Sequence, residues 1–161
     1  MKTDLLFPTP IWQDTCDIEL DPIAEFAYKV KDEDKEGRRS SNAGGGWQSR
    51  DFRTDWIPNT PLKPVYDRIM LNAYACADDF GFKDYRLKMS NMWININGRG
   101  AYNHTHIHGG SIFSGVFYVK VPSCCCGELK FLRPLEYQAM KEYWGCDENF
   151  DRYDKPHNYL D

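Results

Sequence analysis

The stretch LKMSNMWINI, residues 87–96, decides the fold class of this 161-residue chain. Its β-branched and aromatic residues, closed by an Asn-Gly turn dipeptide at 97–98, are typical of a β-strand. Two later segments have the same character, residues 111–121 and residues 127–132. From about residue 84 onward, the chain is therefore predicted to consist mainly of antiparallel strands.

Helical periodicity dominates the chain before this stretch. Asp21 and Pro22 are typical of a helix start, and apolar residues recur at helical spacing over residues 22–31. A longer helix is predicted over residues 62–79, with Gly81 as its stop. Because helices come first and strands follow, we predict a mainly β fold with flanking helices, a β-sandwich or jelly roll. The apolar face of the longer helix consists of Leu62, Val65, Tyr66, Ile69, Met70, Ala73 and Ala77.

Length and charge narrow the class of protein. The length favours a single domain over residues 1–161, with its helical part at about residues 20–80. Lys and Arg number 20 against 24 Asp and Glu, a net charge of −4, so neither a nucleic-acid partner nor a membrane surface is expected. No apolar run approaches the roughly 20 residues of a spanning helix, and no secretion signal is found. The six cysteines are accordingly expected to be reduced, in the cytoplasm.

Several segments are predicted to lie outside the main helices and strands. Residues 5–12 contain two prolines and are expected to form an extended edge or cover segment. The polar, glycine-containing residues 31–53 are expected to form a flexible loop, of the kind that serves as a lid or binding loop. Three consecutive cysteines at 124–126 have the wrong spacing for a zinc site and are expected at a turn tip, with their chemistry open. A short helix is expected from Pro134, and a polar tail from Cys146.

Three of the four histidines lie within five residues, at His104, His106 and His108. On a strand, alternate side chains share a face, so His106 and His108 would point the same way, with His104 able to join them. Two such imidazoles can occupy adjacent positions on one octahedral metal ion. The alternative is a set of surface or hydrogen-bonded histidines. No Asp or Glu lies between Asp84 and Glu128, so a carboxylate ligand must come from elsewhere or be missing.

Five short motifs are spread along the chain. They are LFPTPIW at 6–12, GWQS at 46–49, Trp93-x-Asn95, Asn103-x-x-His106-x-His108, and SGVFYV at 114–119 followed by Pro122. In combination, these motifs resemble the 2-oxoglutarate and iron(II)-dependent oxygenases common in marine bacteria and their phages. The resemblance covers most of the chain, from residue 6 to about residue 134.

This resemblance implies a double-stranded β-helix, the cupin-like jelly roll, with iron(II) held in the mouth of the barrel and 2-oxoglutarate as cosubstrate. His106 and His108 match the metal-binding motif of the family and are the implied iron ligands. Asn95, Ser114 and Tyr118 lie on neighbouring predicted strands and are the implied lining of the cosubstrate pocket. For Tyr118, an ordinary place in the core is the alternative.

The chain also departs from the family pattern. The family usually continues with a strand containing Phe-Pro, a distal histidine ligand, and an arginine that pairs with the far carboxylate of 2-oxoglutarate. No such segment is found before Asp161, so we expect a C-terminally truncated member that lacks the last barrel strands. The contexts of His157 and Arg133 do not match the missing ligands, and His157 is expected to belong to the polar tail.

The leading hypothesis is an iron(II), 2-oxoglutarate-dependent dioxygenase that hydroxylates a C–H bond of an unidentified small molecule, peptide or protein side chain. One alternative is a non-catalytic jelly-roll domain, with a binding or structural role, that has lost the distal ligand. Another is a cupin-like enzyme that uses a different metal such as manganese or nickel. The sequence leaves the oligomeric state open.

Overall fold

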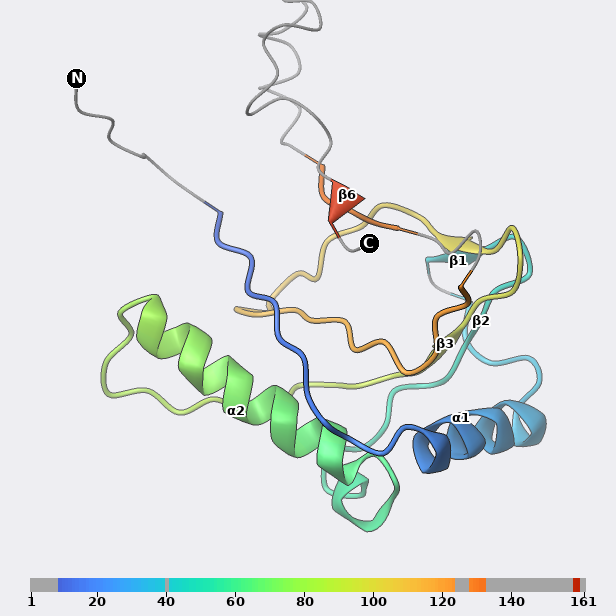
Figure 1. The fold of residues 1–161 in the computed structure, drawn as a ribbon, viewed down its shortest axis with the longest axis horizontal. Helices are drawn as coiled ribbons and strands as arrows, with labels where there is room; N and C mark the ends of the chain where they lie inside the picture. Colours follow the sequence, from blue (N-terminus) through green and yellow to red (C-terminus); the bar gives the residue numbers. More distant parts are fainter. Residues whose placement is uncertain (1–8, 40, 124–127, 133–157, 160–161) are drawn as a thin grey trace, which may run out of the picture. The chain divides into compact units, whose positions relative to one another are not determined.

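The computed structural model describes residues 9–39, 41–123, 128–132 and 158–159. The chain divides into two compact units, residues 1–120 and residues 121–161, which are described separately. The single-domain expectation stays a prediction. The elements of the first unit (Figure 1) are α1 (Asp21–Glu33), β1 (Asn42–Ala43), β2 (Trp47–Gln48), the 3-10 turn η1 (Ile57–Asn59), α2 (Lys63–Asp79), β3 (Asn95–Ile96) and β4 (Tyr102–Asn103). The second unit contains β5 (Leu129–Lys130) and β6 (Asn158–Tyr159).

The two helices predicted before residue 80 are confirmed, with small changes at their ends. The first helix begins at Asp21, which is its first residue and not its cap, and Pro22 lies in the first turn, where its missing N–H costs nothing. The second runs from Lys63 to Asp79. Gly81 then takes a φ of +84°, and the amide of Phe82 donates to the Ala77 carbonyl at 2.9 Å, so the glycine stop is confirmed as well.

The helices share one apolar core with the 3-10 turn. Ile23 from α1, Ile57 from η1 and Val65 from α2 are each at most 2% exposed. Burial of such aliphatic side chains contributes about 1.5–3 kcal/mol each. The strand-like segments of the second half supply the other side of this core. Their half-buried contributors are Met89, Met92, Ile94, Phe117 and Val119.

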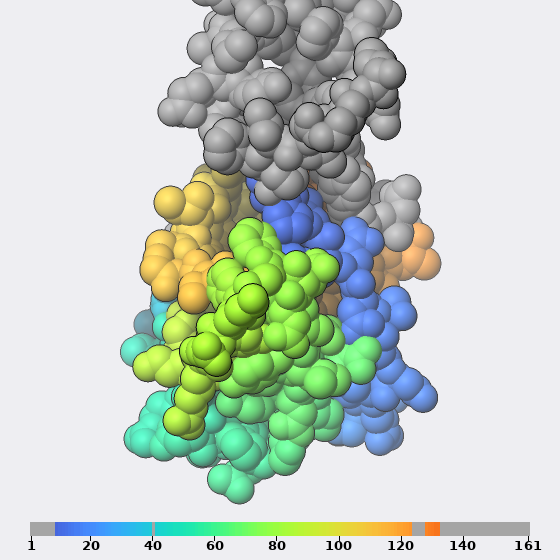
Figure 2. Space-filling model, turned by 90° about the vertical axis from the view of Figure 1, so that its left-hand side faces the viewer, coloured from blue at the N-terminus to red at the C-terminus, as the bar shows by residue number. Residues whose placement is uncertain are grey.

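The described N-terminal segment, residues 9–20, passes alongside α2, as Figures 1 and 2 show. The indole nitrogen of Trp12 donates to Asp79 at 2.7 Å. Asp14 accepts from Arg68 at 2.7 Å and from Asn72 at 2.8 Å. The described part of the predicted cover segment, residues 9–12, contains no helix or strand, in agreement with its prolines.

The flexible loop predicted over residues 31–53 is wrong over its second half. β1 and β2 form there, because Gly44 and Gly45 take φ values of +63° and +83° and allow a tight turn. The indole nitrogen of Trp47 donates to the Asp34 carbonyl at 2.8 Å, and the ring is buried. Polarity and glycine content predicted mobility, whereas the same glycines permit two short antiparallel pairings.

The predicted strand at residues 87–96 is confirmed in part. Only β3 is a regular strand, and it pairs antiparallel with β2, with Gln48 opposite Asn95. The pairing continues irregularly, because the Ser49 amide donates to the Ile94 carbonyl at 2.9 Å and the Phe52 amide donates to the Met92 carbonyl at 2.8 Å. This stretch therefore joins the helical core to the strand pair that precedes the histidines.

The strand predicted over residues 111–121 is not formed. Its side chains do alternate, with Phe117 and Val119 half-buried and Val116 and Tyr118 exposed. Alternation reports which face is buried, and a strand also needs a hydrogen-bonded neighbour, which the described residues do not offer here. Within the predicted 127–132 strand, β5 pairs antiparallel with β6.

Three two-stranded antiparallel sheets are present in the described ranges, so the jelly roll stays a prediction. None of the helices described is both long enough and apolar enough to span a bilayer. Other sequence predictions lie outside the described residues: the cysteines at 124–126, Arg133, the helix from Pro134, the polar tail and His157.

Candidate metal centre

The histidine segment begins where β4 pairs with β1. Asn103 lies opposite Asn42 in this antiparallel pair. The Asn103 amide nitrogen also donates to the Ser41 hydroxyl at 3.1 Å, and the backbone amide of His104 donates to the Ser41 carbonyl at 2.7 Å. These contacts fix the direction in which the chain enters the histidine segment.

The imidazoles of His106 and His108 face each other on the surface. Their ring centroids are 5.0 Å apart, with 29° between the ring planes. The two Nε2 atoms approach to 3.0 Å. The prediction that these two rings share a face is therefore confirmed by their geometry, although the segment is not a regular strand.

The backbone determines which nitrogen of His106 carries its proton. Nδ1 of His106 lies 2.6 Å from the carbonyl oxygen of His104. A carbonyl can only accept a hydrogen bond, so Nδ1 of His106 is the donor. In the neutral ring, Nε2 then carries a lone pair, which points at His108. A ring that donates from one nitrogen to a carbonyl and offers the other is typical of metal-ligating histidines.

His108 is held by two other side chains. Its Nδ1 lies 2.9 Å from the Ser114 hydroxyl oxygen, and its ring makes an edge contact with Trp93 at a centroid distance of 5.4 Å. The backbone also folds back, since the Ser111 amide donates to the His108 carbonyl at 3.3 Å. The ring orientation of His108 thus depends on directional contacts rather than on burial.

The distance between the two Nε2 atoms fits two adjacent positions on one metal ion. Histidine nitrogens bind metals such as zinc at about 2.0–2.1 Å, so two of them at right angles lie about 3.0 Å apart. This is the separation of the two Nε2 atoms. Among the described residues, no third His, Cys, Asp or Glu is placed to join the pair on a metal ion.

His104 does not join the pair with its ring. The ring packs edge-on against Tyr102 at a centroid distance of 5.1 Å, and only the carbonyl of His104 supports His106. The alternating period predicted one face for His106 and His108 and allowed the ring of His104 to join them. Because the segment is irregular after β4, two of the three face each other while the third turns back along the chain.

The three predicted cosubstrate residues lie in different surroundings. Ser114 contacts His108 directly. Asn95 is exposed on β3, and alternate residues of an extended segment share a face, so it lies on the same side as Trp93. Tyr118 is 43% exposed, so the alternative of a buried core aromatic does not describe it. The assignment of these residues to 2-oxoglutarate stays a prediction.

The sequence analysis did not predict that β2, within the expected loop, pairs with β3 and buries the side chain of Gln48. Gln48, opposite Asn95, is 2% exposed, and its Oε1 has no hydrogen-bond partner among the described residues. Side chains of directly opposed residues share one face of the pair. The GWQS motif was the available signal, although polarity and glycine content favoured a loop.

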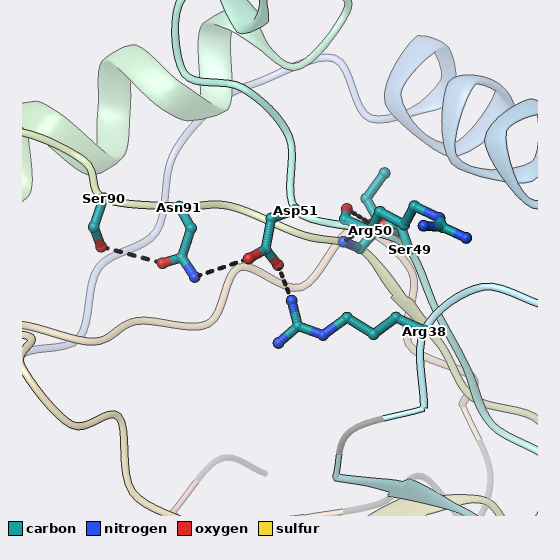
Figure 3. A network of polar contacts seen from close by, with 7 residues as sticks. Arg38, Ser49, Arg50, Asp51, Ser90 and Asn91 are labelled. Carbon is teal, nitrogen blue, oxygen red and sulfur yellow. Dashed lines mark hydrogen bonds and ion pairs between the residues drawn. The ribbon is translucent and has the colours of Figure 1, made fainter.

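A polar network connects segments that flank this strand pair in the sequence (Figure 3). Arg38 bonds one oxygen of Asp51 at 2.5 Å, and Asn91 donates to the other at 3.4 Å. Ser90 donates to Asn91 at 3.1 Å. Asp51 therefore links three segments through both of its oxygens, which is a structural use of this carboxylate.

Comparison with known proteins agrees with the motifs. Residues 91–158 match the model of the family described as "Putative 2OG-Fe(II) oxygenase". No curated protein and no solved structure shows a significant match. The matched range includes the histidine pair, Trp93, Ser114 and also His157. Over these residues, the chain is similar to this oxygenase family.

Proposed function

We propose that this protein is an iron(II) and 2-oxoglutarate-dependent dioxygenase in which His106 and His108 are two of the iron ligands. The observation that carries this proposal is the approach of two Nε2 atoms to 3.0 Å within a segment that matches the family. With the His106 proton on Nδ1, at least one of these atoms presents a lone pair, as a metal ligand must.

The residues of the chain have distinct tasks in this proposal. The His104 carbonyl orients His106, while Trp93 and Ser114 orient His108. Iron(II) and 2-oxoglutarate, when bound, would supply the activation of O₂ for oxidation of a substrate C–H bond, with succinate and CO₂ as products. Amide and hydroxyl groups can bind the carboxylates of 2-oxoglutarate, which is the role proposed for Asn95 and Tyr118.

Anaerobic titration with iron(II) and 2-oxoglutarate tests the proposal. We expect a weak visible charge-transfer band for the unsubstituted chain, and loss of this band in His106→Ala. His104→Ala is the matched control, because it removes a neighbouring imidazole and keeps the carbonyl that holds His106. No band in the unsubstituted chain, or an equal band in His106→Ala, would contradict the assignment.

The exposure of the histidine segment favours a second candidate, a non-catalytic binding or structural domain. All residues from His104 to Gly110 are exposed. The described part of the chain offers no group of three metal ligands that includes the pair. For this candidate, we expect a melting temperature that does not change when iron(II) and 2-oxoglutarate are added. A cupin-like enzyme with manganese or nickel would be separated from both by metal analysis of protein purified without chelator.

A further inference from the structure

Within the described part of the chain, the hydroxyl of Ser114 lies at hydrogen-bond distance from Nδ1 of His108, at 2.9 Å. We propose that Ser114 is a positioning residue that serves His108 in two protonation patterns, as a donor without metal and as an acceptor with metal. This inference rests on the proposed metal role of His108. It assigns Ser114 to the imidazole, whereas the family resemblance suggested the cosubstrate.

The metal-free arrangement forms one continuous chain of hydrogen bonds. Ser114 donates to Nδ1 of His108, Nε2–H of His108 donates to Nε2 of His106, and Nδ1–H of His106 donates to the His104 carbonyl. Only this direction lets all three contacts be hydrogen bonds with neutral rings, because the chain ends on a carbonyl that cannot donate. The 3.0 Å contact between the rings is then an N–H···N bond.

Metal binding needs the opposite pattern at His108. Both Nε2 atoms must then present lone pairs, so His108 loses its Nε2 proton to water and takes a proton at Nδ1. The number of protons on the ring does not change. A hydroxyl can donate or accept, so Ser114 keeps its hydrogen bond to Nδ1 in both patterns. A carboxylate or a carbonyl in its place could serve only the metal-bound pattern.

Ser114 is exposed, so a β-branched residue has room at this position. Ser114→Thr keeps the hydroxyl, and Ser114→Val replaces that hydroxyl by a methyl group of similar shape. These two variants form a matched pair that differs in the hydrogen bond alone. Ser111→Ala is a control in the same segment, because it keeps the backbone amide that donates to His108.

The first measurement uses the metal-free full chain with ¹⁵N-labelled histidine. We expect the His108 ring to be protonated at Nε2, with the resonance of its bare Nδ1 displaced by the hydrogen bond from Ser114. Ser114→Val should lose this displacement, and Ser114→Thr and Ser111→Ala should keep it. An unchanged Nδ1 resonance in Ser114→Val would overturn the proposal.

The second measurement is the anaerobic affinity for iron(II) alone. Loss of an outer-shell partner of a ligating histidine weakens metal binding about 10–100-fold, which we expect for Ser114→Val but not for Ser114→Thr. Equal affinities of these two variants would overturn the positioning role. If the unsubstituted chain binds no iron(II), the proposed function fails, and the metal-free spectra still decide whether Ser114 holds His108.

Discussion

The helical core and the histidine segment are stabilised by different kinds of interaction. Ile57 in the core is fully buried, whereas Ile107, between the two candidate ligands, is 91% exposed. The core depends on the burial of apolar surface, which is a non-directional interaction. The His106–His108 pair depends on a few directional contacts at the surface. Stability and metal binding should therefore respond to different substitutions.

Truncation of the core should have the largest effect on stability. We expect Ile57→Ala to lower the free energy of unfolding by about 2–5 kcal/mol, because it removes buried methyl groups and leaves a cavity. Chemical denaturation measures this change. The matched control is Ile107→Ala, which should stay within about 0.5 kcal/mol because the side chain is already in water. Similar losses for the two variants would contradict the comparison.

Metal should stabilise the chain through binding to the histidine pair. A ligand that binds only the folded state at 100 times its Kd adds about 2.7 kcal/mol. We expect a rise in Tm of this origin on adding iron(II) anaerobically, and no rise in His106→Ala. His106→Ala should leave the Tm of the metal-free chain nearly unchanged, since the ring is exposed. A large fall in the metal-free Tm would mean that the pair supports the fold.

The turn between β1 and β2, which contains Gly44, contacts the chain just before β4 and the histidine segment. A substitution in this turn should therefore affect both the stability of the fold and the binding of iron(II). A Cβ at Gly44, where φ is +63°, would lie 2.4 Å from the Gly100 carbonyl oxygen, just before β4. We expect Gly44→Ala to cost about 1–3 kcal/mol of stability, from backbone strain and this clash, and to weaken iron(II) binding as well. Gly45→Ala is the control, because φ is +83° there and a Cβ meets no atom within 4 Å. If both variants lost the same free energy of unfolding, backbone strain alone would explain the loss, and the contact with Gly100 would play no part.

The same contrast explains what the sequence could predict. Helical periodicity located α1 and α2 to within a few residues, because an apolar face that packs on a core repeats along the chain. The pairing of residues 42–48 with later segments depends on contacts between distant residues, which no local pattern records.

The shared face of the two candidate ligands was predictable from the sequence, and the contacts that orient their rings were not. The spacing of His106 and His108 was enough to predict a shared face. The roles of the His104 carbonyl, Ser114 and Trp93 follow from an irregular backbone after β4, and alternation alone wrongly allowed the ring of His104 to join the pair.

The smallest expected effect is a pH-dependent one at the N-terminal segment. Hydrogen bonds from Asn72 and Arg68 hold the pKa of Asp14 below its ordinary value of 3.8. A lowered pKa in the folded state contributes stability above pH 3.8, and this contribution is lost as the pH falls through the folded pKa. The Tm difference between the unsubstituted chain and Asp14→Asn should thus be present at neutral pH and shrink below pH 3.8.

Asp55→Asn is the comparison for this measurement. The pKa of Asp55 is also lowered, by Arg53 only two residues away, so part of that contact can persist in the unfolded chain. We expect its pH-dependent Tm difference to be smaller than that of Asp14, which bonds to residues more than 50 positions away. A Tm difference for Asp14→Asn that does not vary with pH would show that this carboxylate contributes through its shape and not its charge. The N-terminal segment would then be held mainly by the ring contacts of Trp12 with Phe80, directly after α2, and with Phe113.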